Sequence, residues 1–157
     1  MFIDYIPLML INMSAGLLIL VSFLTKGIES KDQKMWSSGF FMTGAIALIS
    51  GFHMSFNWPL PGSYNVAFGE MSVLFGIIFM GAGFSLFYGL SLVPVAIYAF
   101  FAGLATVAVG FRIINLKMTR EPFVSGIGFI LTGLSGMLAL LYLRLWRNRT
   151  IRFIAAA

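Results

Sequence analysis

Residues Gly51–Gly76 read GFHMSFNWPLPGSYNVAFGEMSVLFG and join two long apolar segments through a short linker without charge. The linker, Asn57–Asn65, is rich in proline and asparagine. Its flanks hold the only histidine of the chain, His53, and a lone carboxylate, Glu70. A spanning helix needs about 20 mostly apolar residues, and both flanks belong to runs of that length. The stretch therefore predicts a helical hairpin that returns two ionisable groups to one face of a membrane.

The composition of the whole chain agrees with a membrane environment. Its 157 residues are 60% hydrophobic and 10% charged, whereas a soluble domain carries about 25% charged residues. So little charge cannot cover a protein surface in water. The chain has no cysteine, which excludes disulfides and thiolate metal sites. The lipid bilayer is therefore the expected partner of most of its surface.

Five segments are long and apolar enough to cross a bilayer. Pro94 and Pro122 fall in the first turns of the fourth and fifth segments, where proline is tolerated. The very short turn Gly89–Ser91 leaves a kinked re-entrant pair as the alternative for the third and fourth segments. The sequence predicts an all-α integral membrane protein, with residues 1–157 in one transmembrane domain. The expected spans are 5–25, 36–56, 65–88, 92–114 and 122–145.

The basic residues lie in three clusters between the apolar runs, as membrane-flanking charges do. An outside N-terminus leaves seven basic residues inside and three outside, which favours a cytoplasmic C-terminus. The amphipathic tail, 145–153, is expected to lie on the inner surface against anionic headgroups. A nucleic-acid partner is not expected, because its binding needs one continuous basic face. The clusters are Lys26, Lys31 and Lys34; Arg112, Lys117 and Arg120; and Arg144, Arg147, Arg149 and Arg152.

With this topology, the strongly polar residues of the membrane region collect in its outer half. His53 lies about one turn below the outer interface, and Glu70 lies at a similar depth. Arg112 and Asn115 reach the same level at the end of the fourth span. Asn12 lies about two turns below the start of the first span. These five residues predict a polar mouth on the outer side.

Glu70 and His53 each have a functional and a structural interpretation. A carboxylate inside a bilayer costs several kcal/mol unless it is paired or hydrated, and Arg112 is the expected partner of Glu70. Alternatively, Glu70 lies at the interface and caps the first turn of the third span. His53 is a structural interfacial residue, a solute-contacting group that titrates near neutrality, or a metal or haem ligand. With one histidine and only Asn57 four residues on, we expect no metal site and no cofactor.

Glycines recur every seven residues in the second to fifth spans. Because seven residues return to nearly the same helix face, each of these spans carries a smooth stripe. Small residues let helix backbones approach closely in lipid, so the pattern predicts a compact bundle and favours a homo-oligomer. The glycines are Gly44 and Gly51; Gly69, Gly76 and Gly83; Gly103 and Gly110; and Gly126 and Gly133.

Several motifs resemble a prokaryotic membrane family known as domain of unknown function 981. They are WPLPGSYN at Trp58–Asn65, FGE at Phe68–Glu70, and the runs Leu74–Gly76, Tyr98–Gly103, Arg112–Asn115 and Gly126–Phe129. The resemblance covers most of the chain and supports its fold and topology, with a location in the cytoplasmic membrane of a prokaryote. The family brings no established activity.

A weaker likeness connects the middle of the chain to the AmiS/UreI family. It rests on Leu74–Gly76, on Tyr88–Leu90 and on Pro94 leading into an aromatic helix. Proteins of that family are urea and short-amide channels, and an acid-gated member opens when its periplasmic groups are protonated. That family has six spans where this chain has five, and the long histidine-bearing outer loop of the acid-gated member is missing here.

The sequence contains no Ser–His–acid spacing, no phosphate loop and no His/carboxylate cluster, so we do not expect an enzyme. We predict a small oligomeric channel or facilitator for a small polar solute or a proton. Its mouth would be lined by His53, Glu70, Arg112 and Asn115, with Asn12 deeper. The alternative is a non-catalytic structural or assembly subunit of a larger membrane complex. The scarcity of polar groups in the inner half favours that alternative, because a conducting path needs a polar lining.

Overall fold

The computed structural model describes residues 6–60 and 63–147, and within them all regular secondary structure is helical. The chain divides into two compact units, Met1–Ser91 and Leu92–Ala157. The prediction of an all-α chain with five membrane-length helices is confirmed, and the single domain over 1–157 stays a prediction. The tail at 148–153 lies outside the described residues. The five helices are Pro7–Gly27, Gln33–Asn57, Asn65–Tyr88, Val93–Asn115 and Pro122–Arg144.

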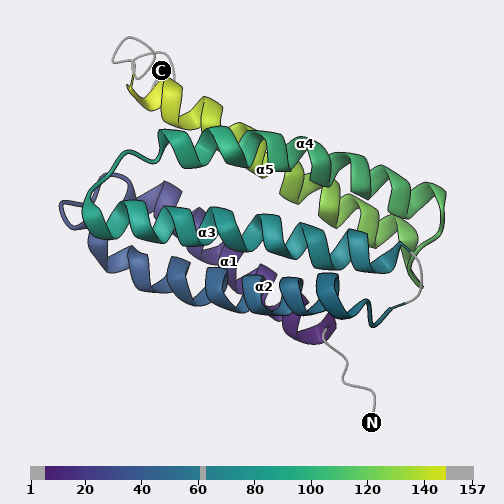
Figure 1. Ribbon diagram of the computed structural model, residues 1–157. Helices are drawn as coiled ribbons and strands as arrows, with labels where there is room; N and C mark the ends of the chain where they lie inside the picture. The colour runs from purple at the N-terminus through teal and green to yellow at the C-terminus, as the bar shows by residue number, and fades with distance from the viewer. Residues whose placement is uncertain (1–5, 61–62, 148–157) are drawn as a thin grey trace. The chain divides into compact units, whose positions relative to one another are not determined.

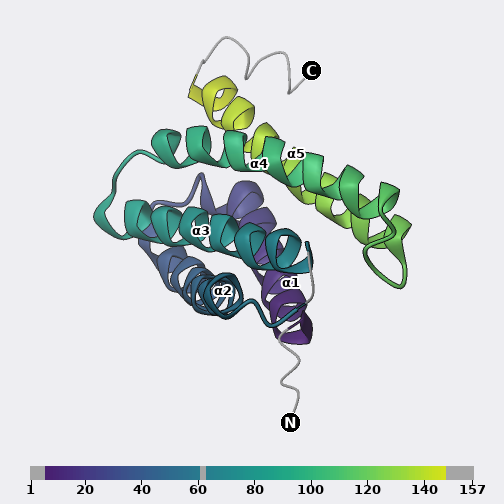
Figure 2. The same ribbon diagram turned by 45° about the vertical axis from the view of Figure 1, so that its right-hand side comes forward.

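The first unit is a helical hairpin with a third helix packed on it. Two antiparallel helices form the first hairpin, α2 and α3, and α1 lies beside them (Figures 1 and 2). Short π- and 3-10-helical segments lead out of α1, into α2 and into α3. The elements are α1 (Ile6–Ser22), η1 (Phe23–Gly27), η2 (Gln33–Trp36), α2 (Ser37–Asn57), η3 (Asn65–Glu70) and α3 (Met71–Tyr88).

A polar and an aromatic contact hold α1 on the first hairpin. The buried Asn12 donates a hydrogen bond from Nδ2 to the carbonyl oxygen of Thr43 in α2, at 2.9 Å. Such a bond between membrane helices contributes about 0.6–2 kcal/mol. Gly16 packs directly on Phe75, because a Cβ added there would lie 2.7 Å from the Phe75 ring. Phe75 belongs to α3 and stacks on Phe79 of the same helix. Through Asn12 and Gly16, α1 therefore contacts both helices of the hairpin.

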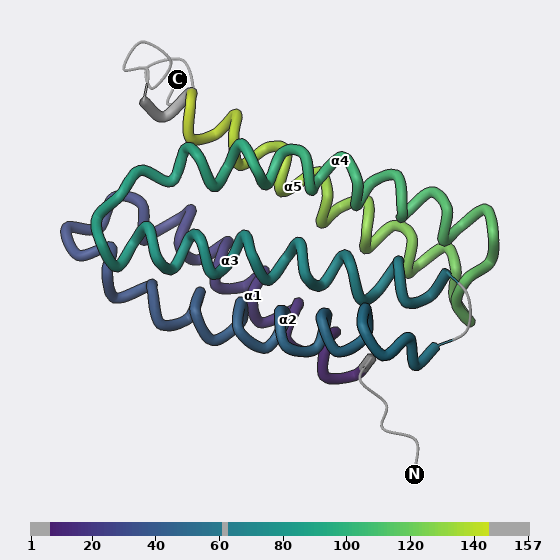
Figure 3. The backbone as a smooth tube through the Cα atoms, viewed as in Figure 1, coloured from purple at the N-terminus to yellow at the C-terminus, as the bar shows by residue number. Residues whose placement is uncertain are grey.

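The second unit is a helical hairpin alone, made of α4 (Val93–Asn115) and α5 (Pro122–Arg147). The backbone trace in Figure 3 follows α4 through a short loop into the antiparallel α5. Pro94 lies in the first turn of α4, as expected. Upstream, α3 ends at Gly89, whose φ of +68° suits glycine, so the re-entrant alternative for the third and fourth spans is replaced by two full helices.

Each hairpin closes on its glycines. A Cβ added to Gly44 would lie 3.0 Å from the carbonyl oxygen of Gly76, and one added to Gly103 would lie 2.5 Å from that of Gly133. The helix backbones therefore touch without intervening side chains, which confirms the predicted close approach. These glycines pack inside the hairpins and so do not by themselves support a homo-oligomer, which stays a prediction.

The two hairpins repeat the same arrangement. Four glycines of the first have counterparts in the second, and the backbone nitrogens of Leu48 and Val107 oppose equivalent glycines, Gly76 and Gly133. The numbering offset is 59 residues between α2 and α4 and 57 residues between α3 and α5. The chain therefore contains two copies of one hairpin in the same orientation along the sequence. The corresponding glycines are Gly44 and Gly103, Gly51 and Gly110, Gly69 and Gly126, and Gly76 and Gly133.

The repeat extends to the ends of α2 and α4. Trp58 has φ 47° and Lys117 has φ 49°, and these are the only described non-glycine residues with positive φ. The left-handed conformation costs an L-residue roughly 1–2 kcal/mol, which is why glycine or asparagine usually holds it. Four residues before each lies a side chain with 0% exposure, Met54 and Ile113. Both hairpins thus place a left-handed residue just after their first helix, but the bonds around it differ, since the Trp58 N–H bonds to the Met54 carbonyl and the Lys117 N–H bonds to the Ile114 carbonyl.

Candidate functional site: the polar ends of the two hairpins

Four of the five predicted site residues lie at the loop ends of the hairpins, and all four are exposed. His53 and Glu70 belong to the first hairpin, and Arg112 and Asn115 belong to the second. Asn12 is buried instead and bonds to α2. The predicted pairing of Glu70 with Arg112 joins residues of two separate units and stays a prediction.

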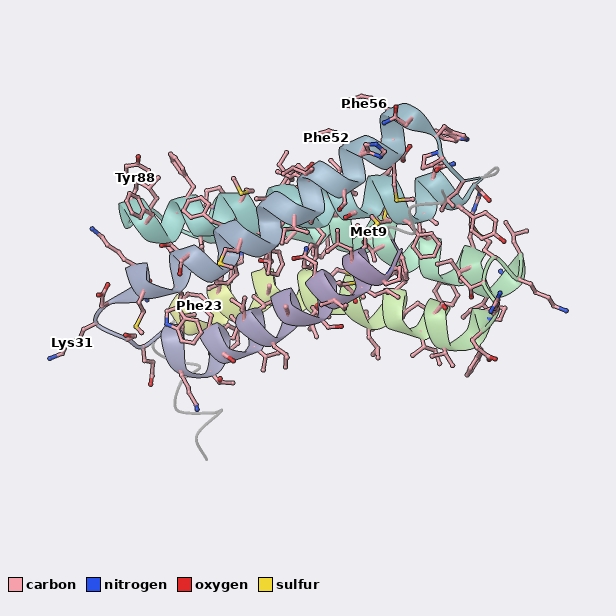
Figure 4. The ribbon with its side chains drawn as sticks, turned by 90° about the horizontal axis from the view of Figure 1, so that it is seen from below. Met9, Phe23, Lys31, Phe52, Phe56 and Tyr88 are labelled. Atoms are coloured by element: carbon pink, nitrogen blue, oxygen red, sulfur yellow. The ribbon has the colours of Figure 1, made fainter. Side chains whose placement is uncertain are left out.

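His53 lies on the side of α2 that faces away from α3. Gly51 and Ser55 contact the η3–α3 segment. Since each helical residue turns by about 100°, His53 points to the opposite side of the helix. That side also carries the stacked rings of Phe52 and Phe56, which project outward in Figure 4 and lie 5.6 Å apart. His53 is therefore presented outward within an aromatic surface rather than into the hairpin.

Glu70 closes the π-helical turn η3 at the start of α3. Its neighbour Gly69 packs on α2, since a Cβ there would lie 3.0 Å from Met54 Cβ. Glu70 itself is exposed, and neither the cap of η3 nor that of α3 has a side-chain hydrogen bond. Glu70, which directly precedes α3, therefore makes no capping hydrogen bond to that helix, and its place at the membrane interface stays a prediction. Short π-turns of this kind occur frequently at functional sites.

Asn65 holds a structural role that the sequence did not predict. Its side chain is completely buried and bonds twice to the backbone of Leu60. Oδ1 accepts from the Leu60 N–H at 3.0 Å, and Nδ2 donates to the Leu60 carbonyl. These two hydrogen bonds to Leu60 close the linker between α2 and η3. Its position at the end of a Pro- and Asn-rich linker was visible in the sequence, but nothing there indicates burial.

Most polar groups inside the helices are satisfied within the chain. Asn12 donates to α2, and several hydroxyl groups donate to the carbonyl four residues earlier in their own helix. Asn12, expected deep in a pathway, therefore holds two helices together. The hydroxyls that bond back in this way belong to Ser14, Thr25, Thr43, Ser50, Ser55, Thr106 and Thr132.

Arg112 occupies the position in the second hairpin that His53 occupies in the first. It is the only charged residue in α4, and like His53 it follows a Gly-Phe pair. Gly110 and Ile114 contact α5, so Arg112 faces away from the partner helix. The exposed Phe111 lies beside it. Each hairpin therefore presents one basic or titratable side chain outward, five residues before its left-handed turn.

The carboxylate is not repeated. The position of Glu70 corresponds to Ile127 in the second hairpin. Among the described residues, no three His, Asp or Glu side chains come close enough together to hold a metal ion. The two polar ends therefore share a basic position and differ in their acidic one.

Comparison with known families identifies the family to which the chain belongs. The family model described as a protein of unknown function, DUF981, matches residues 1–157, and the chain belongs to that family. The predicted resemblance is therefore confirmed over the whole chain. Comparisons with curated proteins and with solved structures gave no match. The likeness to the AmiS/UreI family stays a prediction. The five membrane-length helices are those of a multi-pass membrane protein.

Proposed function

We propose that this member of the DUF981 family is a small membrane channel or facilitator for a small polar solute or a proton. The observation that supports it is the repeated polar end, in which His53 and Arg112 hold equivalent, outward-facing positions. Five alternating spans bring both hairpin loops to one side of the membrane. In this proposal each hairpin end supplies polar groups to the mouth on that side, His53 and Glu70 from the first unit and Arg112 and Asn115 from the second.

The proposed location is the cytoplasmic membrane of a prokaryote, with the N-terminus outside and the C-terminus in the cytoplasm. The Lys/Arg distribution supports this orientation, with seven basic residues inside and three outside. The first described residues of α1 then lie near the outer face. The carboxyl end of α5 then lies near the inner face.

The packing of the hairpins supports a pathway that runs outside them. At the contacts of Gly44 with Gly76 and of Gly103 with Gly133, the backbones of each hairpin lie too close for water to pass between them. A conducting path therefore needs surfaces other than those buried in a hairpin. Copies of the chain in a homo-oligomer supply such surfaces, with the polar ends arranged around the entrance.

Solute flux into proteoliposomes tests the proposal. The panel is urea, acetamide, glycerol and protons, the last followed with a trapped pH dye. We expect flux of at least one of them above protein-free vesicles, and a several-fold loss in Glu70→Gln and His53→Ala. The matched control is Glu29→Gln, an exposed carboxylate in the loop between α1 and α2. Flux that both mouth variants leave unchanged would count strongly against the proposal.

A structural or assembly subunit of a larger membrane complex is the second candidate. The observation that favours it is that hydroxyl groups of α2, α4 and α5 donate hydrogen bonds to carbonyls of their own helices. Such groups offer little lining for a path. Native size in mild detergent separates the candidates. Identical chains in a defined oligomer favour the channel, and stoichiometric co-purification with other proteins favours the subunit.

A further inference from the structure

We propose that the loop end of the second hairpin binds the phosphate of anionic phospholipid headgroups through Arg112, Lys117 and Arg120. All three side chains are exposed. Together with Glu121 they give this end a formal charge of +2. The inference shares Arg112 with the proposed mouth but goes beyond the channel, because it concerns the lipid around the hairpin and rests also on Lys117 and Arg120, which take no part in that mouth.

The backbone at Lys117 is the first observation that points to a ligand. A lysine holds the left-handed conformation in which glycine is favoured. The turn around it is fixed by bonds from the Lys117 N–H to the Ile114 carbonyl and from the Met118 N–H to the Ile113 carbonyl. Met118 and Ile113 are buried, and their burial anchors the turn beneath the exposed side chain of Lys117. A side chain kept at a strained position is a pointer to function.

The first hairpin supplies an internal comparison. Its equivalent left-handed position holds Trp58, which is half exposed. Tryptophan settles at the headgroup level of membranes, and basic side chains pair with lipid phosphates there. Both hairpins therefore place an interface-seeking side chain at the same strained position. Between His53 and Glu70 the first hairpin has no Lys or Arg. Of the two hairpin ends, only that of the second therefore carries the positive charge that an anionic headgroup needs.

The surroundings of Arg112 favour a lipid over a free phosphate ion. Arg112 lies in the last turn of α4, five residues before Lys117. Phe111 and Leu116 beside it are more than half exposed, at 56% and 62%. An arginine on such an apolar surface extends toward the interface and pairs with phosphate there. The apolar neighbours fit the acyl chains of the same lipid.

Native mass spectrometry of the full chain tests the inference. The protein is exchanged into mild detergent with equal amounts of phosphatidylglycerol and phosphatidylcholine, and bound lipid is counted. We expect phosphatidylglycerol to be retained preferentially. Lys117→Gly and Arg112→Gln should each lower its retention about fivefold, the factor for about 1 kcal/mol per basic residue at an anionic surface. Lys117→Gly should also raise the thermal midpoint, because glycine adopts the positive φ freely.

These opposite changes separate lost binding from lost folding. The matched control is Lys31→Gln, an exposed lysine in the loop between α1 and α2, which should leave retention unchanged. Equal retention in the wild type, Lys117→Gly and Arg112→Gln would overturn the inference. So would inorganic phosphate that binds the lipid-free protein and displaces phosphatidylglycerol, since the site would then be for a soluble anion.

Discussion

In the first hairpin, two phenylalanines lie where the second hairpin has an alanine and a glycine. Phe40 and Phe79 pack with ring centroids 5.3 Å apart. The corresponding residues are Ala99 and Gly136, and a Cβ added to Gly136 would lie 3.0 Å from the Ala99 carbonyl oxygen. The first pair of rings forms part of the surface that receives α1 and η1. At the same register the second pair brings two backbones together.

This difference separates the residues that set the hairpin fold from the residues that distinguish one hairpin from the other. The glycine contacts are the same in both hairpins and set the helix register, because a backbone contact tolerates no added side chain. The flanking residues differ, and they decide whether a third helix packs on the hairpin. The polar ends follow the same rule, with a shared position for His53 and Arg112 and an unshared one for Glu70.

The largest expected effect is the loss of a shared glycine contact. Gly103→Leu should destabilise the protein by about 3 kcal/mol, because the new Cβ would meet the Gly133 carbonyl at 2.5 Å and force α4 and α5 apart. Gly44→Leu should act similarly on the first hairpin. Unfolding followed by circular dichroism in mixed micelles measures both.

Gly128→Leu is the matched control for the glycine variants. Nothing lies within 4 Å of a Cβ added at Gly128, although it is on the same helix as Gly133. Its effect should stay within about 0.5 kcal/mol. If Gly103→Leu were as mild as Gly128→Leu, the two hairpins would not share their packing.

The two hydrogen bonds between Asn65 and Leu60, the linker clamp, belong to the first hairpin alone. The position of Asn65 corresponds to Pro122 in the second hairpin. Asn65→Ala should cost about 2 kcal/mol, because it leaves the N–H and carbonyl of Leu60 without their side-chain partner. Limited proteolysis should then cut within 57–65 faster, with the loop between α4 and α5 unaffected. Asn57→Ala is the control, because Asn57 bonds only to an exposed backbone carbonyl. Equal cleavage of the two variants would refute the clamp.

Lipid explains why so much of this fold was predictable from the sequence. A bilayer requires long apolar helices with internally bonded backbones, so the five spans followed from length and composition. The seven-residue glycine period predicted the stripes that close the hairpins. Counting residues from the ends of the predicted spans placed His53, Glu70, Arg112 and Asn115 at the helix ends. These features depend on sequence position alone.

The features that could not be predicted depend on tertiary contacts. Nothing local to a lysine indicates a positive φ, and the turn at Lys117 exists because Met118 and Ile113 are buried beneath it. In the sequence, Asn12 and Asn65 are both asparagines near the start of a predicted span. One bonds a neighbouring helix and the other closes a loop, and only the folded chain distinguishes them.

The bond between α1 and α2 tests the part of the first unit that the second lacks. Asn12→Leu should lower stability by about 1 kcal/mol, because the donor to the Thr43 carbonyl is lost. Ser14→Ala is the control, since that hydroxyl is exposed and bonds within its own helix. Hydrogen exchange should rise in α1 and leave α4 and α5 unchanged. Faster exchange in the second hairpin would mean that α1 stabilises more than its own unit.

The smallest expected effect concerns the left-handed position that both hairpins share. Trp58→Gly should stabilise the first hairpin by about 0.5 kcal/mol, because glycine removes the strain at φ 47° while adding unfolded-state entropy. Asn57→Gly, one residue earlier within the helix, should instead destabilise it by about 0.5–1 kcal/mol. Opposite signs at adjacent positions, read from thermal midpoints, would show that backbone strain is held at position 58. If both variants lost stability, Trp58 would contribute packing that outweighs its strain, and its equivalence to Lys117 would be limited to the backbone.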